Sequence, residues 1–315
     1  MKNAKDYTVA VLGTQNAVGQ AILAELELQN YPIELVHPLD LHQESGGHIL
    51  YQNQLLTSFA LDLFDMTQPH ILFLCEPRIF ERYPHHFLHG KNWIIDCTGR
   101  LHKAPCIIPS LNPQNILCAG HKCLCAPNSA TIALASVLHP LYEKYGVDSA
   151  EATAILGAWY PQPNLADKLI YQTRQCFAQT SSVSFSPTLA FNLIPEFFHK
   201  LIPLIQHQLH CFVSCPVQIH SCFAPVLRGG VFFVQIVLHK TARLSGIRAI
   251  FQNNSLCQIL ETPQTIGTHD LVVEDKLYLQ NLTLSHNKLS FWLMQDPVQS
   301  GFIQNAVKIM TLLQK

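Results

Sequence analysis

Ser129 is the residue in this chain whose position most directly suggests chemistry. It lies in the segment Cys125-Ala126-Pro127-Asn128-Ser129-Ala130, directly before apolar residues at helical spacing. A cysteine at the start of a helix is a reactive nucleophile, because the helix dipole stabilises the thiolate. A serine hydroxyl is a much weaker acid and needs an adjacent base before it can attack a carbonyl carbon. We therefore expect Ser129 to be the N-cap of the helix, an interaction worth roughly 1 kcal/mol.

A second group of residues could bind a phosphate. The apolar run 8–12 is followed by a turn and then by the apolar positions of a helix over residues 20–29. This pattern is typical of the glycine-rich turn that binds the pyrophosphate of NAD or NADP. The candidate cofactor contacts are Gly13, Asn16, Val18 and Gly19. Asn16 replaces the middle glycine; it tolerates a positive φ, but we expect its side chain to project where the phosphate would lie.

The ribose contact predicted from the sequence is Asp40. It follows the predicted strand 33–36, and a carboxylate at that place accepts a hydrogen bond from a ribose hydroxyl, which favours NAD. A 2′-phosphate would instead need Arg or Lys with Ser, and neither Arg nor Lys occurs between the predicted strand 33–36 and Glu44-Ser45. A turn that is kept only for the fold, without a bound nucleotide, is the favoured interpretation.

Cysteines and histidines at close spacing raise the question of a metal. Cys118, His121, Cys123 and Cys125 have suitable side chains, but no second C-x-x-C pair completes a tetrahedral set. Cys123 and Cys125 also alternate as the inward residues of a strand would. The cluster of His85, His86 and His89 is better explained as the polar face of a helix. We therefore predict no metal site.

The order of predicted elements indicates an α/β fold. Buried strands are expected over residues 8–12, 33–36, 70–75 and 93–97, and the helical stretches between them favour a Rossmann-like, doubly wound parallel sheet. A helix is expected from Ser129 to Gly146. Beyond it, strands over 152–156, 217–222, 230–239 and 277–284 predict a second α+β domain with a mostly antiparallel sheet. An amphipathic helix over 298–313 closes the chain.

Composition excludes several classes of protein. The chain has 315 residues, of which 48% are hydrophobic and 13% charged, so two folded domains are expected rather than disorder. A net charge of −1 without a basic tract argues against nucleic-acid binding. No apolar run reaches about 20 residues, which argues against a membrane span. The 11 cysteines and the absence of a signal-peptide pattern predict reduced thiols and a cytoplasmic location.

Several segments resemble the aspartate-semialdehyde dehydrogenases. They are residues 9–19, 104–113, 125–132, 138–141, 224–230 and 305–309, so the resemblance extends over essentially the whole chain. Residues 189–195, L-A-F-N-L-I-P, are similar to a segment of the Usg-1 proteins, a divergent branch of that family. The resemblance implies two domains: residues 1–128 with the C-terminal helix 297–315, and residues 129–296. It also implies NADP or NAD as cofactor and a homodimer formed through the second domain.

The positions that carry the family's chemistry differ in this chain. The nucleophilic cysteine corresponds to Ser129, and the catalytic histidine corresponds to Gly230 in the segment 224–230. A glycine can neither accept a proton nor orient a nucleophile. The family's arginine and glutamine correspond to Phe223 and Leu156. Arg100 corresponds to a basic residue that would bind substrate phosphate or carboxylate.

Three functions remain open on this basis. The favoured hypothesis is a relative of the dehydrogenases that keeps their fold but lacks semialdehyde dehydrogenase activity. The alternative is an NAD(P)-dependent oxidoreductase of altered chemistry that acts on a small aldehyde or carbonyl metabolite, because hydride transfer alone needs no covalent intermediate. A metal-binding module built on residues 118–125 is the third.

Overall fold

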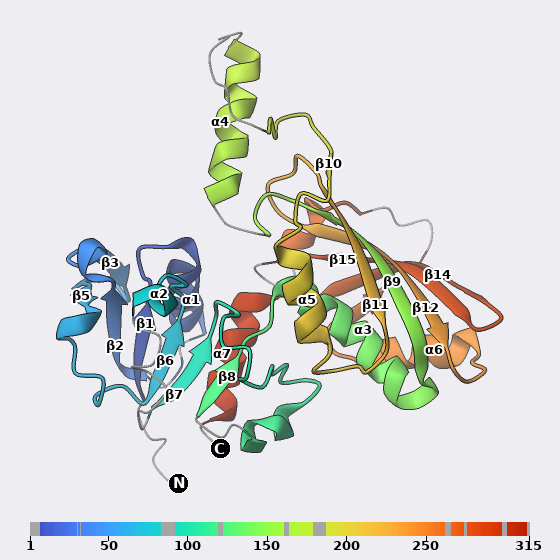
Figure 1. Cartoon of the computed structure of the whole chain (residues 1–315), viewed down its shortest axis with the longest axis horizontal. Coiled ribbons are helices and arrows are strands. Elements are labelled where there is room, and N and C mark those ends of the chain that lie inside the picture. Colours follow the sequence, from blue (N-terminus) through green and yellow to red (C-terminus); the bar gives the residue numbers. More distant parts are fainter. Residues whose placement is uncertain are drawn as a thin grey trace. The chain divides into compact units, whose positions relative to one another are not determined.

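The chain forms two compact units, which we describe separately. Unit 1 contains Met1–Pro127 and Phe302–Lys315, and unit 2 contains Asn128–Gly301 (Figure 1). The computed structural model describes residues 7–29, 31, 33–82, 92–118, 122–160, 164–178, 187–261, 266–273, 276–297 and 301–313. Within these ranges, no helix is long and apolar enough to cross a membrane.

Unit 1 is built on a six-stranded sheet in the order β5-β2-β1-β6-β7-β8. The strands are β1 Tyr7–Leu12, β2 Ile33–Asp40, β5 Phe59–Ala60, β6 Ile71–Leu74, β7 Trp93–Asp96 and β8 Cys123–Cys125. Each neighbouring pair in this order is parallel. The predicted Rossmann-like sheet is therefore confirmed. After β1, the next strands of the sheet, β2 and β5, lie on one side of it, and the later strands β6, β7 and β8 lie on the other. The direction in which strands follow one another across the sheet therefore reverses between β1 and β6. In open parallel sheets, ligands bind at such a reversal, outside the carboxyl ends of the strands.

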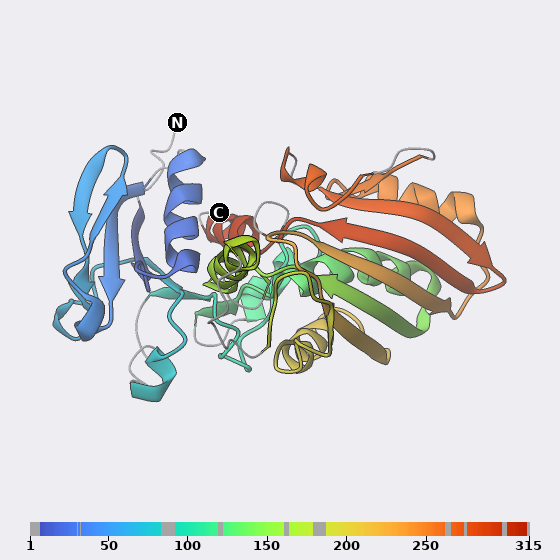
Figure 2. The same ribbon diagram turned by 90° about the horizontal axis from the view of Figure 1, so that it is seen from above.

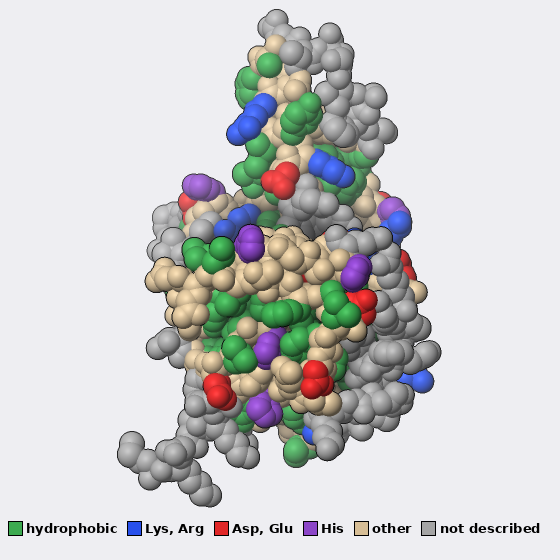
Figure 3. All heavy atoms as spheres, turned by 90° about the vertical axis from the view of Figure 1, so that its left-hand side faces the viewer, with side chains coloured by type: hydrophobic (Ala, Val, Ile, Leu, Met, Phe, Trp, Pro, Cys, Tyr) green, Lys and Arg blue, Asp and Glu red, His purple; other side chains and the backbone are tan. Residues whose placement is uncertain are grey.

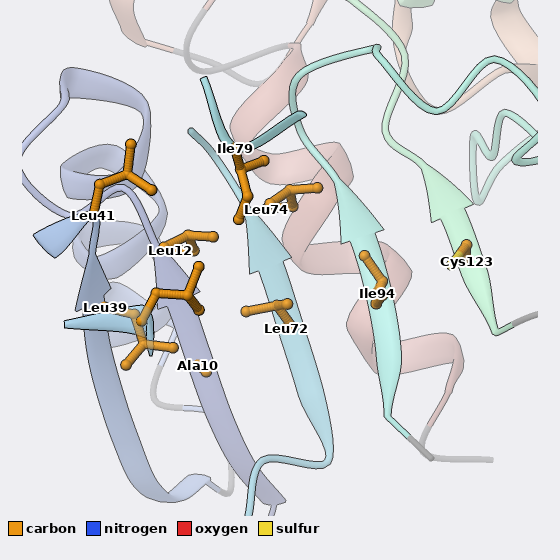
Figure 4. Packing of buried hydrophobic residues seen from close by; sticks show 10 residues of the cluster. Ala10, Leu12, Leu39, Leu41, Leu72, Leu74, Ile79, Ile94 and Cys123 are labelled. Atoms are coloured by element: carbon orange, nitrogen blue, oxygen red, sulfur yellow. The ribbon is translucent and has the colours of Figure 1, made fainter. Parts of the chain in front are cut away.

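The strands of unit 1 are buried on both faces, as their continuous apolar sequences predict. On one face, alternate residues of neighbouring strands pack into a single cluster with Ile79 of α2 (Figure 4). The members that Figure 4 labels are Ala10, Leu12, Leu39, Leu41, Leu72, Leu74, Ile79, Ile94 and Cys123. This packing fixes the carboxyl ends of β1, β2 and β6, from which the candidate phosphate contacts extend.

Helices and a hairpin complete unit 1. The helices are α1 Ala17–Leu28, α2 Ile79–Arg82 and α7 Phe302–Leu312, with 3-10 helices η1 His42–Glu44, η2 Leu61–Leu63 and η3 Pro113–Cys118. The C-terminal helix α7 packs on α1 and β7. The hairpin is β3 His48–Tyr51 and β4 Gln54–Thr57. Figure 3 shows the face of unit 1 on which the hairpin and β5 lie, where hydrophobic side chains gather among polar ones; the exposed ones include Leu50, Leu55 and Phe59.

Unit 2 is built on a seven-stranded mixed sheet in the order β10-β11-β9-β12-β15-β14-β13. The strands are β9 Val147–Leu156, β10 Ile194–Pro195, β11 Val217–Phe223, β12 Gly230–Leu238, β13 Cys257–Ile259, β14 Leu277–Ser285 and β15 Lys288–Gln295. Only the β9–β11 and β13–β14 pairs are parallel. The expected second domain with a mostly antiparallel sheet is confirmed.

The helices of unit 2 are α3 Ser129–Tyr145, α4 Asn164–Ala178, α5 Leu201–Leu209 and α6 Leu244–Asn253, with the 3-10 helix η4 Asp270–Val273. In Figure 2, α3 and α6 run beside the strands, and α3 packs on β9 and β12. The sequence analysis predicted α3 but missed α4, α5 and α6. Pro203 in the first turn of α5 and Gly246 in α6 weaken the helical pattern, although proline is tolerated in a first turn.

Candidate functional site

Four buried residues form one row across the end of the unit 2 sheet. In the strand register, Phe223 lies opposite Leu156, Leu156 opposite Gly230, and Gly230 opposite Gln295. Residues that lie opposite one another in a sheet point to the same face. The positions expected to hold the family's arginine, glutamine and histidine are therefore neighbours, and here they hold phenylalanine, leucine and glycine. Gln295 is the polar member of the row, and the sequence analysis did not identify it.

The side chain of Tyr160 occupies the space beside Gly230. A Cβ atom built on Gly230 would lie 2.6 Å from Cζ of Tyr160, closer than such atoms approach in real structures, and closer still to the hydroxyl oxygen. The hydroxyl donates a hydrogen bond to Oε1 of Gln295 at 3.1 Å, and the residue is only 6% exposed. The volume that a histidine side chain at position 230 would need is filled by a phenol.

A close approach of two turns holds Tyr160 in this position. The chain leaves β9 at Gly157, whose N–H donates to Gly229 O at 3.0 Å, and the N–H of Ala158 donates to Val226 O at 2.9 Å. A Cβ atom on Gly157 would lie 2.8 Å from Val226 O, so glycine is needed for the approach. The turn directs Tyr160 back over the start of β12. No motif in the sequence marks this contact, because it depends on two turns far apart in the chain.

An ion pair between the partly exposed Arg228 and the buried Asp296 lies beside the phenol. Nη2 of Arg228 donates to Oδ1 of Asp296 at 2.9 Å, and Asp296 is fully buried. Burial, and next the charge of Asp296, raise the pKa of Tyr160 well above its ordinary value of 10.0. The phenol therefore remains protonated at neutral pH. It can donate a hydrogen bond but cannot act as a general base.

Ser129 is not the N-cap of α3, which corrects the expectation from the sequence. The cap is Asn128, whose Oδ1 accepts from Ala130 N at 2.9 Å, and Ser129 is the first helical residue. The cap is held from α5: Oε1 of Gln208 accepts from Asn128 N at 2.9 Å and from the Thr131 hydroxyl at 2.8 Å. The segment after Pro127 therefore reaches helical geometry one residue earlier than a cap at Ser129 would allow.

Ser129 and the row of the sheet converge at Gly301. A Cβ atom on Gly301 would lie 2.9 Å from Cβ of Ser129 and 3.1 Å from Nε2 of Gln295. Ser129 is 4% exposed, so it lies within this packed arrangement. The two predicted catalytic positions are thus linked through Gln295, which lies opposite Gly230 and, through Gly301, close to Ser129.

The glycine-rich turn of unit 1 has the form that the sequence predicts. Gly13 has φ +99°, and its N–H donates to Leu39 O at 2.8 Å. A Cβ atom on Gly19 would lie 2.8 Å from the carbonyl carbon of Gly13, so a glycine is required where α1 passes the turn. Val18 lies in the first turn of α1, where the helix dipole favours an anion. Several N–H groups of the turn already donate within the protein: Gly13 N to Leu39 O, Gln15 N to Asp40 Oδ1 and Gly19 N to Asn16 Oδ1.

Asn16 has φ −95°, so the turn does not use the positive φ that asparagine tolerates, and its side chain lies at the start of α1. Oδ1 accepts from Gly19 N at 2.9 Å, and Nδ2 donates to Cys75 O at 3.1 Å. Asn16 is thus the N-cap of α1, a role for which asparagine is among the best residues. Its side chain is therefore taken up by the turn itself.

Asp40 is not placed to hold a ribose, which corrects a second expectation. It is fully buried, with Oδ2 accepting from the Thr14 hydroxyl at 2.6 Å and Oδ1 accepting from Gln15 N at 3.1 Å. Both carboxylate oxygens are used to fix the turn. The reason for preferring NAD over NADP is therefore removed.

A basic residue that the sequence analysis missed does reach this edge of the sheet. Arg78, after β6, lies between the carboxylates of Glu76 and Glu44, and Glu44 is the residue near which a 2′-phosphate contact was sought. Arg78 and Glu44 are 34 positions apart, which concealed this proximity in the sequence. At this edge of the sheet Arg78 is thus engaged by two carboxylates, Glu76 and Glu44.

Arg100 lies on a loop that is organised by a buried carboxylate. Oδ1 of Asp96 accepts from the backbone and the hydroxyl of Thr98 at 2.8 and 2.6 Å, and Oδ2 accepts from Leu101 N at 2.9 Å. Burial raises the pKa of Asp96, and these hydrogen bonds oppose the increase. The Arg100 side chain is exposed at the surface of unit 1.

The cysteines of the described segments are free thiols. Cys123 and Cys125 are buried in β8, and burial, followed by the charge of Asp96, raises the pKa of Cys123 to about 11. In the part of the chain that the structure describes, no group of three or more His, Cys, Asp or Glu side chains could hold a metal. His121, the side chain of Cys118 and the cluster of His85, His86 and His89 lie outside the described residues.

No protein-family profile matches the chain. It is 20% identical to an aspartate-semialdehyde dehydrogenase of Shewanella violacea over 332 residues, which cover 98% of each chain. It is 23% identical to a USG-1 protein homolog of Azotobacter vinelandii over 338 residues, covering 98% of this chain and 97% of the other.

Solved structures show the same fold. A probable aspartate-semialdehyde dehydrogenase from Pseudomonas aeruginosa superposes with a TM-score of 0.90 at 20% identity over 99% of each chain. An aspartate semialdehyde dehydrogenase with NADP from Candida albicans has a TM-score of 0.78 at 12% identity, over 98% of this chain and 99% of the other. The resemblance found in the sequence is confirmed: the chain is a full-length relative of proteins named aspartate-semialdehyde dehydrogenase and USG-1 protein homolog, and it has the dehydrogenase fold.

Proposed function

We propose that the chain is an aspartate-semialdehyde dehydrogenase-like protein without semialdehyde dehydrogenase activity. The observation that carries this proposal is the occupation of the space beside Gly230 by Tyr160. A protonated phenol stands where the family has an imidazole base, and a hydroxyl at Ser129 stands where it has a thiol. Nucleophile and base act as a unit, and the loss of either costs several orders of magnitude in rate.

Neighbouring groups in unit 2 do not compensate for these changes. Tyr160 donates its proton to Gln295 and cannot accept one from Ser129 at neutral pH. The Asp296 carboxylate is engaged by Arg228 in an ion pair. Restoring the chemistry would therefore require a new nucleophile, a new base and the removal of Tyr160.

The test is an assay of pure protein with aspartate semialdehyde, phosphate and NADP. We expect no NADP reduction above background, whereas an active relative assayed in parallel gives a normal rate. The double variant S129C/G230H is expected to stay inactive, because the imidazole overlaps Tyr160. Clear turnover by the unaltered protein would disprove the proposal.

A second candidate function is nicotinamide-nucleotide-dependent reduction or oxidation of a small carbonyl compound. The observation that favours it is the intact turn, with Gly13 at φ +99° and Gly19 packed closely beneath it. NADP or NAD would supply the hydride chemistry, and the first turn of α1, which contains Val18 and Gly19, would face the phosphates. Nucleotide titration followed by melting temperature and tryptophan fluorescence tests it, and no response up to millimolar nucleotide would exclude it.

A homodimer through unit 2 is a further part of the proposal. Phe232, Val234 and Ile236 of β12 are buried on the sheet face on which α3 packs. On the opposite face, Phe233 and Trp292 are partly exposed, with their ring centroids 5.0 Å apart. Aromatic residues on a sheet face are favourable contacts for a second copy of the chain.

A cytoplasmic location is proposed from the family resemblance and the free thiols, and fractionation of cells tests it.

A further inference from the structure

The hairpin of unit 1 presents two leucines to solvent side by side. Strands β3 and β4 are joined by a two-residue turn at Gln52 and Asn53, and both residues have a positive φ, as a type I′ turn requires. Leu50 lies directly opposite Leu55 in the strand register, so both side chains point to the same face of the hairpin. They are 67% and 66% exposed, whereas Tyr51, the next residue of β3, is 7% exposed. The hairpin therefore leaves an apolar pair on its outer face.

A third large apolar side chain lies close to this pair. Phe59 of β5 is 55% exposed, and a single residue, Ser58, separates it from β4. β5 is the terminal strand of the six-stranded sheet. Figure 3 shows the face on which these elements lie, where hydrophobic side chains gather among polar ones. We call Leu50, Leu55 and Phe59 the edge patch. Contiguous exposed apolar side chains of this kind mark interaction sites.

The chain around the edge patch is acidic. Between Lys5 and Arg78 the sequence contains neither lysine nor arginine. The acidic residues in this interval are Asp6, Glu25, Glu27, Glu34, Asp40, Glu44, Asp62, Asp65 and Glu76. Two of their carboxylates adjoin the elements of the patch. Glu27 accepts a hydrogen bond from Gln52 N in the hairpin turn at 3.1 Å, and Asp62, which is 38% exposed and lies 3.5 Å from His42, is on η2 directly after β5. This surface repels nucleic acid and anionic membranes and attracts a cationic protein surface.

The same charges disfavour a second copy of the chain on the edge patch. A two-fold contact joins identical surfaces of the two copies. The carboxylates of Glu27, Glu34 and Asp62 in one copy would then face those of the other. Like charges placed opposite each other across an interface are strongly unfavourable. The occupant that fits is therefore apolar at its centre and basic at its margins.

We propose that the edge patch docks a basic amphipathic helix of another protein. Apolar side chains three or four residues apart on a helix lie about 5–6 Å from each other, close to the separation of roughly 5 Å between opposite residues such as Leu50 and Leu55. Lysine or arginine beside the apolar stripe of that helix would meet the carboxylates around the patch. The inference goes beyond the proposed loss of dehydrogenase activity, because it gives unit 1 a binding role that needs neither a nucleophile nor a base.

The test uses the full chain and a defined peptide. The probe is a fluorescently labelled helix of about 18 residues, or five turns, with leucine on one face and lysine beside it, and its twin has glutamate in place of each lysine. Binding is measured by fluorescence anisotropy at low and high salt. L50Q/L55Q removes the leucines of the patch, and D62K reverses a charge beside it.

The matched control is L117Q. Leu117 is 91% exposed on η3, which precedes β8 at the opposite end of the sheet from β5. Thermal unfolding confirms that each variant is folded, and the single variant L55Q replaces L50Q/L55Q if the double variant is unstable.

We expect the lysine peptide to bind, and salt to weaken the binding because part of the attraction is electrostatic. L50Q/L55Q should weaken it by about tenfold, the effect of removing central apolar contacts, D62K should weaken it several-fold, and L117Q should leave it unchanged. The absence of binding would overturn the inference, as would equal binding of the glutamate twin. If sedimentation velocity shows that L50Q/L55Q abolishes self-association of the chain, the patch belongs to a second copy and the inference is wrong. None of these outcomes depends on turnover, so the inference and the proposed loss of activity fail separately.

Discussion

The hydroxyl group of Tyr160 is hydrogen-bonded to Gln295 across 135 residues of sequence, at a distance of 3.1 Å. Gln295 lies opposite Gly230 in the strand register, so the same phenol also covers the glycine. The missing side chain at position 230 is thus part of a packed arrangement and not an empty pocket. A side chain added at position 230 would disturb this packing, and the disturbance can be measured as a change in the free energy of unfolding.

Gly230→Ala is predicted to destabilise the protein. Alanine normally stabilises a strand relative to glycine by about 0.5–1 kcal/mol. Here the new Cβ atom would overlap Tyr160, and overpacking in a core costs about 1–3 kcal/mol. We expect the free energy of unfolding, measured by denaturant titration, to decrease by an amount in that range.

The matched control is Gly267→Ala, where the new Cβ atom would have its nearest neighbour, Asp270 Oδ2, at an ordinary 3.7 Å. It should change stability by less than about 0.5 kcal/mol. In a Tyr160→Ala background, the cost of Gly230→Ala should largely disappear. A cost that is the same with and without Tyr160 would show that the phenol does not fill this space.

Tyr160→Phe separates the hydrogen bond from the packing. The ring stays, and the donor to Gln295 is lost, which we expect to cost about 1 kcal/mol in the free energy of unfolding. In ultraviolet absorbance titration, the unaltered protein should contain one more tyrosine that fails to ionise near pH 10 than the variant does, because burial and Asp296 raise the pKa of Tyr160. An identical number of non-ionising tyrosines in the two proteins would contradict this assignment.

The cap of α3 gives a prediction that distinguishes neighbouring residues. Asn128→Ala removes the side-chain acceptor of Ala130 N and should reduce stability by about 1 kcal/mol. Ser129→Ala removes a hydroxyl from the first helical residue and should cost less, because that residue is not the cap. Chemical denaturation of both variants measures the difference. The reverse order of costs would restore Ser129 as the cap.

A charged substitution on the exposed sheet face of unit 2 tests the proposed dimer surface. Phe233→Asp places a carboxylate between Phe233 and Trp292 on the sheet face that we propose to pair with a second copy. We expect sedimentation velocity to show a shift from dimer to monomer at micromolar concentration, because a buried unpaired charge is strongly unfavourable. Gln252→Asp, on an exposed position of α6, is the control and should leave the assembly unchanged. A monomer in the unaltered protein would also contradict the proposal.

The sequence predicted what depends on local patterns. The apolar runs of β1, β6 and β7 and the turn from Gly13 to Gly19 lie where the residues indicated, because buried parallel strands and glycine-rich turns are encoded within short segments. The departures at Ser129, Gly230, Phe223 and Leu156 were also visible, since known motifs surround them. Phe223, Leu156 and Gly230 lie in one row because of the register between their strands, and this register cannot be predicted from a single sequence.

What the sequence did not predict depends on contacts between distant segments. Tyr160 over Gly230, Arg78 beside Glu44, and Asp40 beneath Thr14 each join residues that are 26 or more positions apart. The misplaced cap at Ser129 has a local cause, because Asn128 and Ser129 are both good capping residues and only the backbone geometry decides between them.

The ion pair of Glu76 and Arg78 predicts a specific response to acid. Hydrogen bonds from Arg78 outweigh the effect of burial and hold the pKa of Glu76 below its ordinary value of 4.5. The folded state therefore binds this proton less readily than the unfolded state. The stabilisation by Glu76 is complete above about pH 4.5 and is lost as the pH falls through the lower folded-state pKa.

Glu76→Gln should consequently destabilise the protein at pH 7, and its stability should fall less steeply than that of the unaltered protein when the pH is lowered below 4.5. Denaturant titrations at several pH values measure both effects. Glu81→Gln, an exposed position on α2, is the control and should change stability at pH 7 by less than about 0.5 kcal/mol. An unchanged acid slope in Glu76→Gln would mean that the carboxylate is not held by Arg78 as the two hydrogen bonds between them indicate.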